Sequence, residues 1–525
     1  MRNGAKLAAM QDMHLPEAEI DASSRWGLKA SVRSSSRHVA AGQIVAKLAG
    51  LAVSIYIFHK LSVGEQGVYN WFMGTVIYFS YLTTLGVNES LQRYVPEYHA
   101  NGQYRRISRT FTYCAFSVAC LSVLVFSLTG LYFRPLASFF KKESYEYIFV
   151  FFAFGAGLFL QYILLYIVLN GLFLHRYQVW GQVAYIVLKG IFMFALFQAG
   201  YGLKAVFLAD ILAYTPVLAV LLILYRKWIV PKLKADATGE ETVEVKRVGS
   251  YAALNLATAP GTIMYDYSTD YLIIAHYLSD ETLGLYSFSV RASRMFLQML
   301  PQKMIETVIR PAFYAKYATT ADKKRALHEM FNTLCRINLF FLVPMMVVLA
   351  VGGRHIIPLL GGRKFLDAYP TLVWTFAFIC VSFFELPVDL VIQSTEKIIY
   401  RSIAQVFSIF RVAAVILVVK AGYGITIVAI VTGCALLVKN VFIYYFARKH
   451  GGIRFEWASF AKIAVNALAA GASVYGVLLV LNNVVGLILG FLLGAGVYLL
   501  MTFLLSPFTS KEREHMLFMV RRRAR

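Results

Sequence analysis

The sequence predicts an all-α polytopic membrane protein with about 14 transmembrane helices. Of its 525 residues, 59% are hydrophobic and only 15% are charged, and its mean hydropathy is +0.62. A soluble domain carries about 25% charged residues. The apolar residues also form continuous runs of roughly 20, which is long enough to cross the hydrocarbon core as a helix. These runs do not alternate at period two, as barrel strands do.

The predicted spans follow the apolar runs along the chain. They are 38–60, 66–88, 108–132, 147–170, 178–198, 203–225, 250–277, 284–308, 329–351, 369–392, 402–420, 424–446, 459–481 and 484–506. Residues 1–36 contain no apolar core of the signal-peptide type, so we expect them to form a polar, mobile cytoplasmic leader.

The net charge is +23, and the distribution of the Lys and Arg residues along the chain indicates the membrane topology. With the N-terminus inside, most Lys and Arg residues fall in the predicted inner loops, for example Arg105, Arg106 and the run at 323–325. This bias predicts that both termini are cytoplasmic. The basic tail RRRAR (521–525) attracts anionic lipid. The charge therefore indicates a membrane and not a nucleic-acid partner.

The junctions between spans repeat after six helices. AGYG occurs at 199–202 and again at 421–424, and LSVGEQGVY (61–69) is matched by LSDETLGLY (278–286). Six is an even number, so both copies begin on the same side of the membrane and form a parallel repeat. Two such lobes enclose a central seam, which is where transporters bind their substrates.

The repeat divides the chain into six parts. They are a leader (1–36), an N-lobe (37–225), an inter-lobe linker (226–248), a C-lobe (249–447), two further spans (448–506) and a basic tail (507–525).

Four of the basic residues inside predicted spans are selected as candidates: Lys47, Arg291, Arg294 and Arg411. Such a charge near the bilayer centre costs about 2.5–3.5 kcal/mol on insertion scales, so these residues are functional candidates. The planar guanidinium group donates two parallel hydrogen bonds to phosphate. We therefore expect a positively charged lumen that binds a diphosphate. The alternatives are snorkelling and pairing with nearby carboxylates.

Five carboxylates inside the spans are also candidates: Asp210, Asp266, Asp270, Glu385 and Asp389. Asp266 and Asp270 are four residues apart, as are Glu385 and Asp389, so each pair repels unless a cation, a proton or an Arg lies between them. One interpretation is an H+ or Na+ site that couples to movement of the lobes. The other is a set of salt bridges to Arg291 or Arg294 across the seam.

The sequence has no pattern typical of catalysis or metal binding. Its ten His and five Cys residues show no metal-ligand spacing, and no Ser/His/Asp order suggests a nucleophile. We therefore predict no catalytic residue, no metal, no disulfide framework and no cofactor other than a coupling ion.

The order of the motifs resembles a known family. The first span is followed by L-S-x-G-x-x-G-x-Y, and the second ends in LGVNESLQRYVPEY (85–98). From about residue 37 to the end, the chain is similar to the polysaccharide transporter branch of the MOP superfamily, whose members include the Wzx-type flippases.

This resemblance implies a V of two six-helix lobes, two extra helices and alternating access. It implies transfer of an undecaprenyl-diphosphate-linked oligosaccharide repeat unit from the inner to the outer leaflet of the bacterial cytoplasmic membrane, for O-antigen or exopolysaccharide synthesis. The implied partners are this lipid, the surrounding membrane lipids and polymerase or co-polymerase machinery, with the chain itself a monomer.

Related lipid II flippases hold the diphosphate with basic residues in their first and eighth helices. Lys47 and Arg294 resemble those positions, and Arg291 lies one turn outward. This chain has Val53 and Ser54 where those relatives carry a second basic residue in the first helix.

Three other functions stay open. A cation-coupled drug exporter of the same superfamily would have an acidic, aromatic lumen. A membrane glycosyltransferase or polymerase would need a larger outer segment than 133–146 or 352–368. A scaffold in a polymer-synthesis complex could use the leader and the basic tail.

Overall fold

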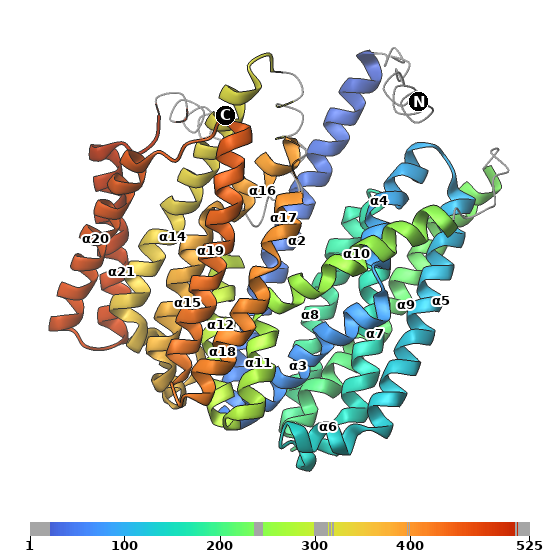
Figure 1. The fold of residues 1–525 in the computed structure, drawn as a ribbon, viewed down its shortest axis with the longest axis horizontal. Helices are drawn as coiled ribbons and strands as arrows, with labels where there is room; N and C mark the ends of the chain where they lie inside the picture. Colours follow the sequence, from blue (N-terminus) through green and yellow to red (C-terminus); the bar gives the residue numbers. More distant parts are fainter. Residues whose placement is uncertain are drawn as a thin grey trace, which may run out of the picture.

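The structure is a computed structural model that describes residues 22–235, 245–298, 320–395 and 399–509, with residues 313, 317, 397 and 512. Over these residues the chain is helical, without β-strands, and the helices form two halves that converge at the end opposite the chain termini (Figure 1). The predicted all-α polytopic fold is confirmed. We call the end that carries the termini the terminal end and the opposite one the junction end.

The first half begins with the long helix α2. Its elements are α2 (Ala22–Lys60), α3 (Val63–Thr84), α4 (Val87–Ala100), α5 (Tyr104–Leu131), α6 (Phe133–Phe139), η1 (Glu143–Tyr145), α7 (Glu146–Gly171), α8 (His175–Gln198) and α9 (Lys204–Ala235).

The second half begins at α10 and is followed by two further helices. The elements are α10 (Val245–Tyr265), α11 (Tyr267–Tyr277), α12 (Asp280–Gln298), α14 (Lys323–Gly361), η2 (Arg363–Ala368), α15 (Tyr369–Val381), η3 (Ser382–Phe384), α16 (Glu385–Ser394), α17 (Ile399–Ala404), α18 (Phe407–Lys420), α19 (Ile425–Gly451), α20 (Trp457–Val480) and α21 (Val484–Leu505).

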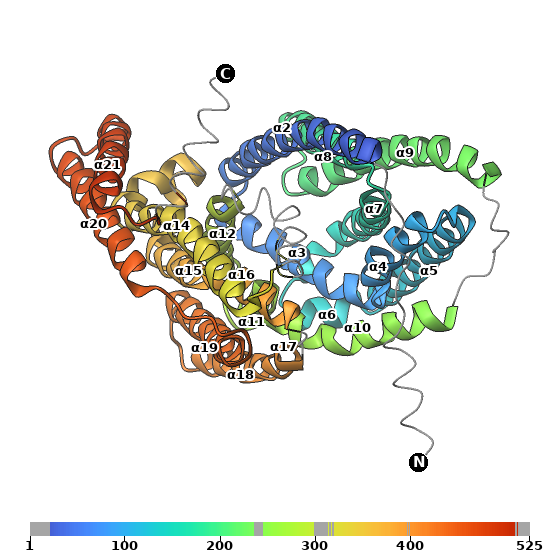
Figure 2. The ribbon, with the colours of Figure 1, turned by 90° about the horizontal axis from the view of Figure 1, so that it is seen from above.

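The two halves pack in the same pattern. In the first, α2 packs on α8, α8 on α9, α7 on α9 and α5 on α7. In the second, α10 and α11 pack on α18, α18 on α19, α15 and α16 on α19, and α14 on α15. Seen from above, α2 and α10 run along opposite edges of the first half (Figure 2), and α10 also packs on α4 and α3. Helices α20 and α21 pack on α14 at the edge.

Eleven helical segments in the described part of the chain are long and apolar enough to cross a membrane. Within the described residues, no such segment covers the second, seventh or eighth predicted span, which contain α3–α4, α10–α11 and α12; residues 299–308 of the eighth span lie outside the described part. These helices pack on one another at the seam: α3 contacts α10, α11 and α12, and α11 contacts α12. Because part of their surface packs on protein, they carry more polar residues than the outer helices.

Several helices are longer than their predicted spans. Helix α2 begins at Ala22, so residues 22–36 of the predicted mobile leader are helical. Most of the predicted linker is also helical, because α9 continues to Ala235 and α10 begins at Val245. Residues 1–21, 236–244 and 513–525 of the predicted leader, linker and tail lie outside the described residues.

The repeated AGYG tetrapeptide ends helices α8 and α18 in the same way. Gly200 and Gly422 adopt φ values of 82° and 80°, which a residue with a Cβ rarely adopts. Their N–H groups, and those of Tyr201 and Tyr423, donate to carbonyls in the preceding turn. This is the glycine C-cap of a Schellman motif, which satisfies the last carbonyls of a helix.

The repeated L-S…G-x-Y motif forms the joint between the halves. Ser62 accepts a hydrogen bond from the N–H of Glu65, and Ser279 accepts one from Thr282, so both serines cap the helices that follow. Helices α3 and α12 then cross so closely that a Cβ on Gly67 would lie 2.1 Å from the Asp280 carbonyl oxygen. A Cβ on Gly284 would lie 1.9 Å from that of Val63.

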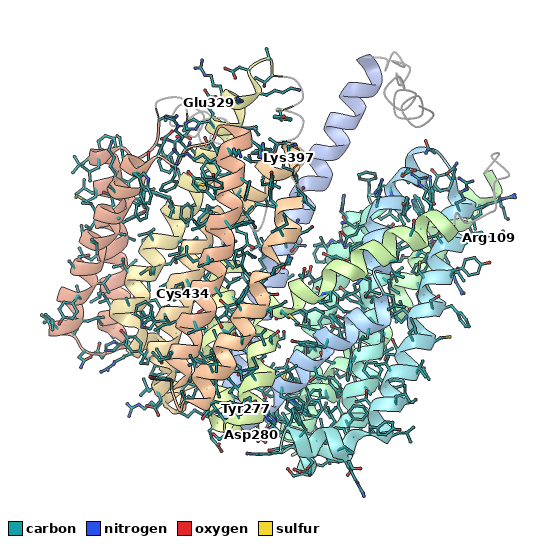
Figure 3. The ribbon with its side chains drawn as sticks, in the orientation of Figure 1. Arg109, Tyr277, Asp280, Glu329, Lys397 and Cys434 are labelled. Carbon is teal, nitrogen blue, oxygen red and sulfur yellow. The ribbon has the colours of Figure 1, made fainter. Side chains whose placement is uncertain are left out.

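Polar contacts at the joint also relate equivalent positions of the two copies. Asn70 donates to Ser287 at 3.0 Å, and each is the residue after the motif's Tyr. Lys142, from the first half, pairs with Asp280, while Lys364, from the second, donates to the carbonyls of His59 and Leu61. Figure 3 places Asp280 at the junction end. The apolar core there contains residues of both halves.

We predict that Gly284→Ala destabilises the joint, because the added methyl group meets the backbone of Val63 and not a movable side chain. Overpacking of this kind costs about 1–3 kcal/mol, so the thermal unfolding midpoint in detergent should fall. Gly476→Ala in α20, where the methyl group meets open space, is the matched control and should not lower it. An unchanged midpoint for Gly284→Ala would contradict the close crossing.

Candidate functional site

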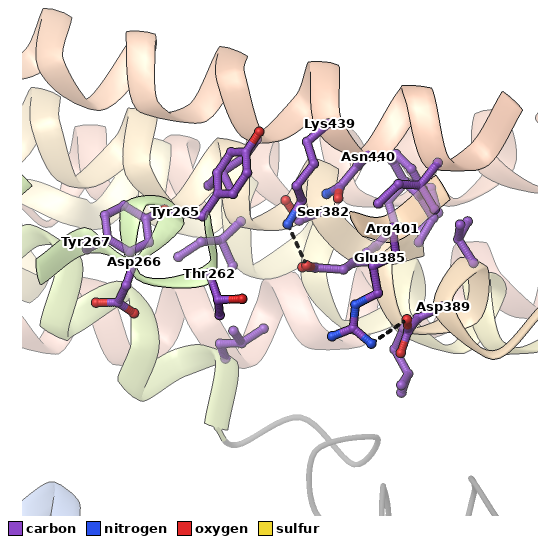
Figure 4. A pocket seen from close by; sticks show the side chains of 18 of the residues that line it. Thr262, Tyr265, Asp266, Tyr267, Ser382, Glu385, Asp389, Arg401, Lys439 and Asn440 are labelled. Carbon is purple, nitrogen blue, oxygen red and sulfur yellow. Dashed lines mark hydrogen bonds and ion pairs between the residues drawn. The ribbon is translucent and has the colours of Figure 1, made fainter. Parts of the chain in front are cut away.

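A cavity of about 540 Å³ lies within the second half and is closed on one side by Ile77 and Tyr81 of α3. Its other walls come from α10, α11, α12, α14, α15, η3, α16, α17 and α19. Because residues of both halves border it, movement of one half against the other changes its shape. Figure 4 shows the polar side chains that line it.

Three spans are broken where they reach this cavity. The seventh is interrupted at Asp266, between α10 and α11, the tenth by the 3-10 turn Ser382–Phe384, and the eleventh between α17 and α18, where Gln405 lies. Irregular backbone at membrane depth is tolerated where it is buried in protein or lines a cavity. Broken helices of this kind surround the substrate sites of transporters.

Asp266 explains the break in the seventh span. Its carboxylate accepts a hydrogen bond from the N–H of Ser268 at 2.8 Å and so caps the N-terminus of α11. Its other oxygen binds Arg294 of α12 at 3.0 Å. The Arg294 side chain is 40% exposed and lies over the ring of Tyr267. It therefore presents part of its guanidinium group to the cavity.

Two further ion pairs line the same cavity. Lys439 of α19 lies 3.2 Å from Glu385, and Arg401 of α17 lies 3.2 Å from Asp389 (Figure 4). Glu385 and Asp389 thus share one face of α16, as their spacing predicts. The lining holds three basic and three acidic side chains, so this structure shows a charge-balanced cavity where the sequence predicts a positive lumen.

Lys47 and Arg291 lie along the contact between α2 and α12. The Lys47 ammonium donates to the Gln298 carbonyl at 2.7 Å, one helical turn beyond Arg294. Arg291 donates to Ser54 of α2 at 3.2 Å and lies over the rings of Phe58 and Tyr69. Arg291 therefore brings a positive charge next to Ser54 of the first span, where the chain has no basic residue of its own.

Arg411 differs from its predicted role. Its side chain has no exposed surface, and it binds the carboxylate of Asp270, which is also fully buried, and the carbonyl of Met264. Tyr286 and Thr432 donate to the other Asp270 oxygen at 2.6 and 3.0 Å. The break at Asp266 separates Asp270 from the cavity, so the two aspartates do not share a face. Arg411 is here a structural counterion.

Asp210 lies in the core of the first half, away from the cavity. It binds Lys189 of α8 at 2.7 Å and accepts a hydrogen bond from Tyr185 at 2.6 Å. Each of the five carboxylates predicted for ion coupling is therefore paired with a basic side chain. An H+ or Na+ coupling role stays a prediction, and the described residues contain no His, Cys, Asp and Glu group suited to a metal.

The sequence prediction omitted Lys189 and Lys439, although both lie inside predicted apolar spans. The criterion that selected Lys47 also applies to them. Arg401 lies immediately before a predicted span and gave no such signal. No sequence signal marked the neutral polar residues Asn440 and Gln405 either, because an amide in an apolar run is common on any helix that packs on protein.

A family model described as polysaccharide biosynthesis protein matches residues 61–370, more than half of the chain. No curated protein matches the sequence. The fold is similar to the lipid II flippase MurJ in an inward closed conformation, with a TM-score of 0.66 and 13% identity over 88% of this chain and 97% of that chain.

Two multidrug-type structures show the same architecture. An inward-facing multidrug resistance MATE family transporter of the MOP superfamily gives a TM-score of 0.54 at 14% identity, covering 78% of this chain and 94% of that one. The bent form of the Vibrio cholerae MATE transporter VcmN gives 0.51 at 11% identity, covering 80% and 98%. The fold is thus that of MOP transporters, as the sequence resemblance predicts.

We predict that Arg411→Gln strongly destabilises the protein, because it leaves the Asp270 carboxylate buried without a counterion. Breaking a buried pair in this way costs about 3–5 kcal/mol, measurable as a lower unfolding midpoint in detergent. Adding Asp270→Asn should restore much of the loss. The exposed pair Arg325–Glu329 is the control, since Arg325→Gln should change stability by less than about 0.5 kcal/mol. A double variant no more stable than Arg411→Gln would contradict this role.

Proposed function

The chain belongs to this family of polysaccharide biosynthesis proteins, and on that basis we propose that it is a flippase for undecaprenyl-diphosphate-linked oligosaccharide repeat units. It moves them from the inner to the outer leaflet of the bacterial cytoplasmic membrane, for O-antigen or exopolysaccharide synthesis. The observation that carries this proposal is the cavity at three broken helices, with Arg294 partly exposed in it.

The charge distribution supports the proposed orientation of the chain in the membrane. Arg109 and Lys397 lie at the terminal end (Figure 3), as do the basic first turns of α5 (105–109) and α14 (323–325). The positive-inside rule assigns this end to the cytoplasm. The halves are then joined at the outer face, and the seam opens inward in this conformation.

The physical task is to carry a charged, hydroxyl-rich headgroup past hydrocarbon while its polyprenyl tail stays in lipid. The headgroup enters the seam, and its diphosphate replaces Asp266 as the partner of the Arg294 guanidinium. Lys47 and Arg291 lie nearby, along the adjoining contact between α2 and α12. Asp266 keeps the hydrogen bond that caps α11. No covalent bond is made or broken, so the chain acts as a transporter and not as an enzyme.

Release to the outer leaflet requires the junction end to open. The contacts Asn70–Ser287, Lys142–Asp280 and Lys364 with the carbonyls of His59 and Leu61 then break, and the terminal ends of the halves approach. Each of these contacts is polar and is replaced by water on opening, so the net cost is about 0.5–1.5 kcal/mol for the neutral Asn70–Ser287 contact and about 1.5–3 kcal/mol for each contact of a lysine. We propose that the chain performs this cycle as a monomer, next to polymerase machinery that uses the product.

The second candidate is a cation-coupled exporter of small molecules. The three carboxylates of the cavity favour it, since they could bind an organic cation. Each is paired with a basic side chain, however, which repels such a cation. Resistance to cationic dyes in cells that express the chain would support the exporter, and unchanged sensitivity would support the flippase.

Arg294→Ala should reduce polymer export at least tenfold and cause the lipid-linked oligosaccharide to accumulate in the inner leaflet, because the diphosphate loses its charged partner in the cavity. Membrane levels of the variant are measured in parallel. Arg325→Ala, at the terminal end, is the matched control and should leave export unchanged. Normal export by Arg294→Ala at normal protein level would refute the proposed site.

A disulfide between Asn70→Cys and Ser287→Cys should lock the junction end and stop export, because these side chains are in direct contact across the joint. Reductant should restore export. Each single variant reports the effect of the substitutions alone. Export by the fully cross-linked protein would show that the joint does not open during transport.

A further inference from the structure

We propose that the part of the cavity between α16, α17 and α19 is a saccharide subsite that binds the sugar next to the diphosphate. This inference rests on the proposed function. It adds which part of the headgroup binds at which end of the cavity. Asp266 lies at one end of the cavity, and the pairs Lys439–Glu385 and Arg401–Asp389 lie at the other (Figure 4). Arg294 binds Asp266 and therefore belongs to the first end.

The charges at this second end are suited to a neutral polyol more than to an anion. Each of its two basic groups has a carboxylate partner at 3.2 Å, so the end carries no net charge. The side chains of Glu385 and Arg401 are nevertheless about half exposed, at 56% and 52%. They offer free lone pairs and N–H groups, which bind the paired hydroxyls of a sugar ring.

Two amide side chains of the lining have unused hydrogen-bonding groups. The Asn440 residue is 3% exposed, and its Nδ2 has no hydrogen-bond partner in the described part of the chain; the same holds for Oε1 of Gln405. A buried polar group without a partner costs about 1–3 kcal/mol. One donor and one acceptor without partners among the lining residues indicate a ligand that has both, as a sugar hydroxyl does.

Aromatic rings lie between the two ends. Tyr265 and Tyr267 flank the break at Asp266, and Tyr81 of α3 covers the cavity from the first half. The ammonium of Lys439 lies 4.7 Å from the centre of the Tyr265 ring, which fixes that ring at the wall. Tyrosine rings combine an apolar face, on which sugar C–H groups pack, with a polar hydroxyl group.

The size of the cavity sets how much of the headgroup it holds. Its volume of about 540 Å³ lies in the range of sites for small molecules, about 300–1,000 Å³. It accommodates a small part of an oligosaccharide next to the diphosphate and not a whole repeat unit. The subsite therefore binds the sugar at the reducing end, and the remaining sugars of the repeat unit extend into the seam.

The test compares the binding of two probes by the purified full-length protein. One is undecaprenyl diphosphate, and the other is undecaprenyl diphosphate that carries a single N-acetylhexosamine. Asn440→Leu and Glu385→Gln should each weaken binding of the glycosylated probe about five- to tenfold, the effect of one lost hydrogen bond, and leave the unglycosylated probe unchanged. Arg294→Ala should weaken both. Asn466→Leu, the same change on α20, is the matched control and should alter neither.

The outcomes separate the inference from the proposed function. If the wild-type protein binds both probes equally and Asn440→Leu and Glu385→Gln change neither, the subsite is refuted while the flippase assignment stands. If the wild-type protein binds neither probe, the proposed function itself fails. If one of these two variants binds neither probe, its site has lost its structure, and the other variant decides. The inference then fails unless that other variant loses binding of the glycosylated probe and keeps binding of undecaprenyl diphosphate.

Discussion

The close crossing of α3 and α12 is the constraint on which the rest of the structure depends. Gly67 and Gly284 occupy equivalent positions of the repeat, and each lies against the backbone at the start of the other's helix. No side chain separates the helices there, so the halves meet over a short, tightly packed joint and diverge toward the terminal end. A seam that opens at one end, with a cavity beside it, follows from this geometry.

Charge neutralisation is the second constraint. The hydrocarbon region makes an unpaired charge costly, and each of the five carboxylates predicted for ion coupling has a basic partner within its own half. The pairs differ in access to solvent. Arg411–Asp270 is sealed in the core and holds α11 against α18 and α19, whereas Arg294–Asp266 is partly exposed at a helix break. Only a pair of the second kind can exchange its partner for a ligand without leaving a charge buried alone.

Part of the site could be predicted from the sequence and part could not. The spacing of Glu385 and Asp389 placed both on one face of a helix, and the structure shows this, because α16 is regular between them. The same reasoning failed for Asp266 and Asp270, because Asp266 caps a new helix and turns the chain. A charge in an apolar run marks a residue that needs a partner, but it does not distinguish a structural counterion from a ligand-binding group.

The sequence by itself determined that the chain is a helical membrane protein, and the repeated Ser, Gly and Tyr positions determined that it has two similar halves. Both properties are local, since they depend on hydrophobic run length, helix caps and glycine conformation. Only the tertiary structure decided which basic residues are exposed, which are sealed in the core and where the cavity lies. Those properties depend on which helices break and which helices pack together. Both are set by contacts between residues that are far apart in the chain.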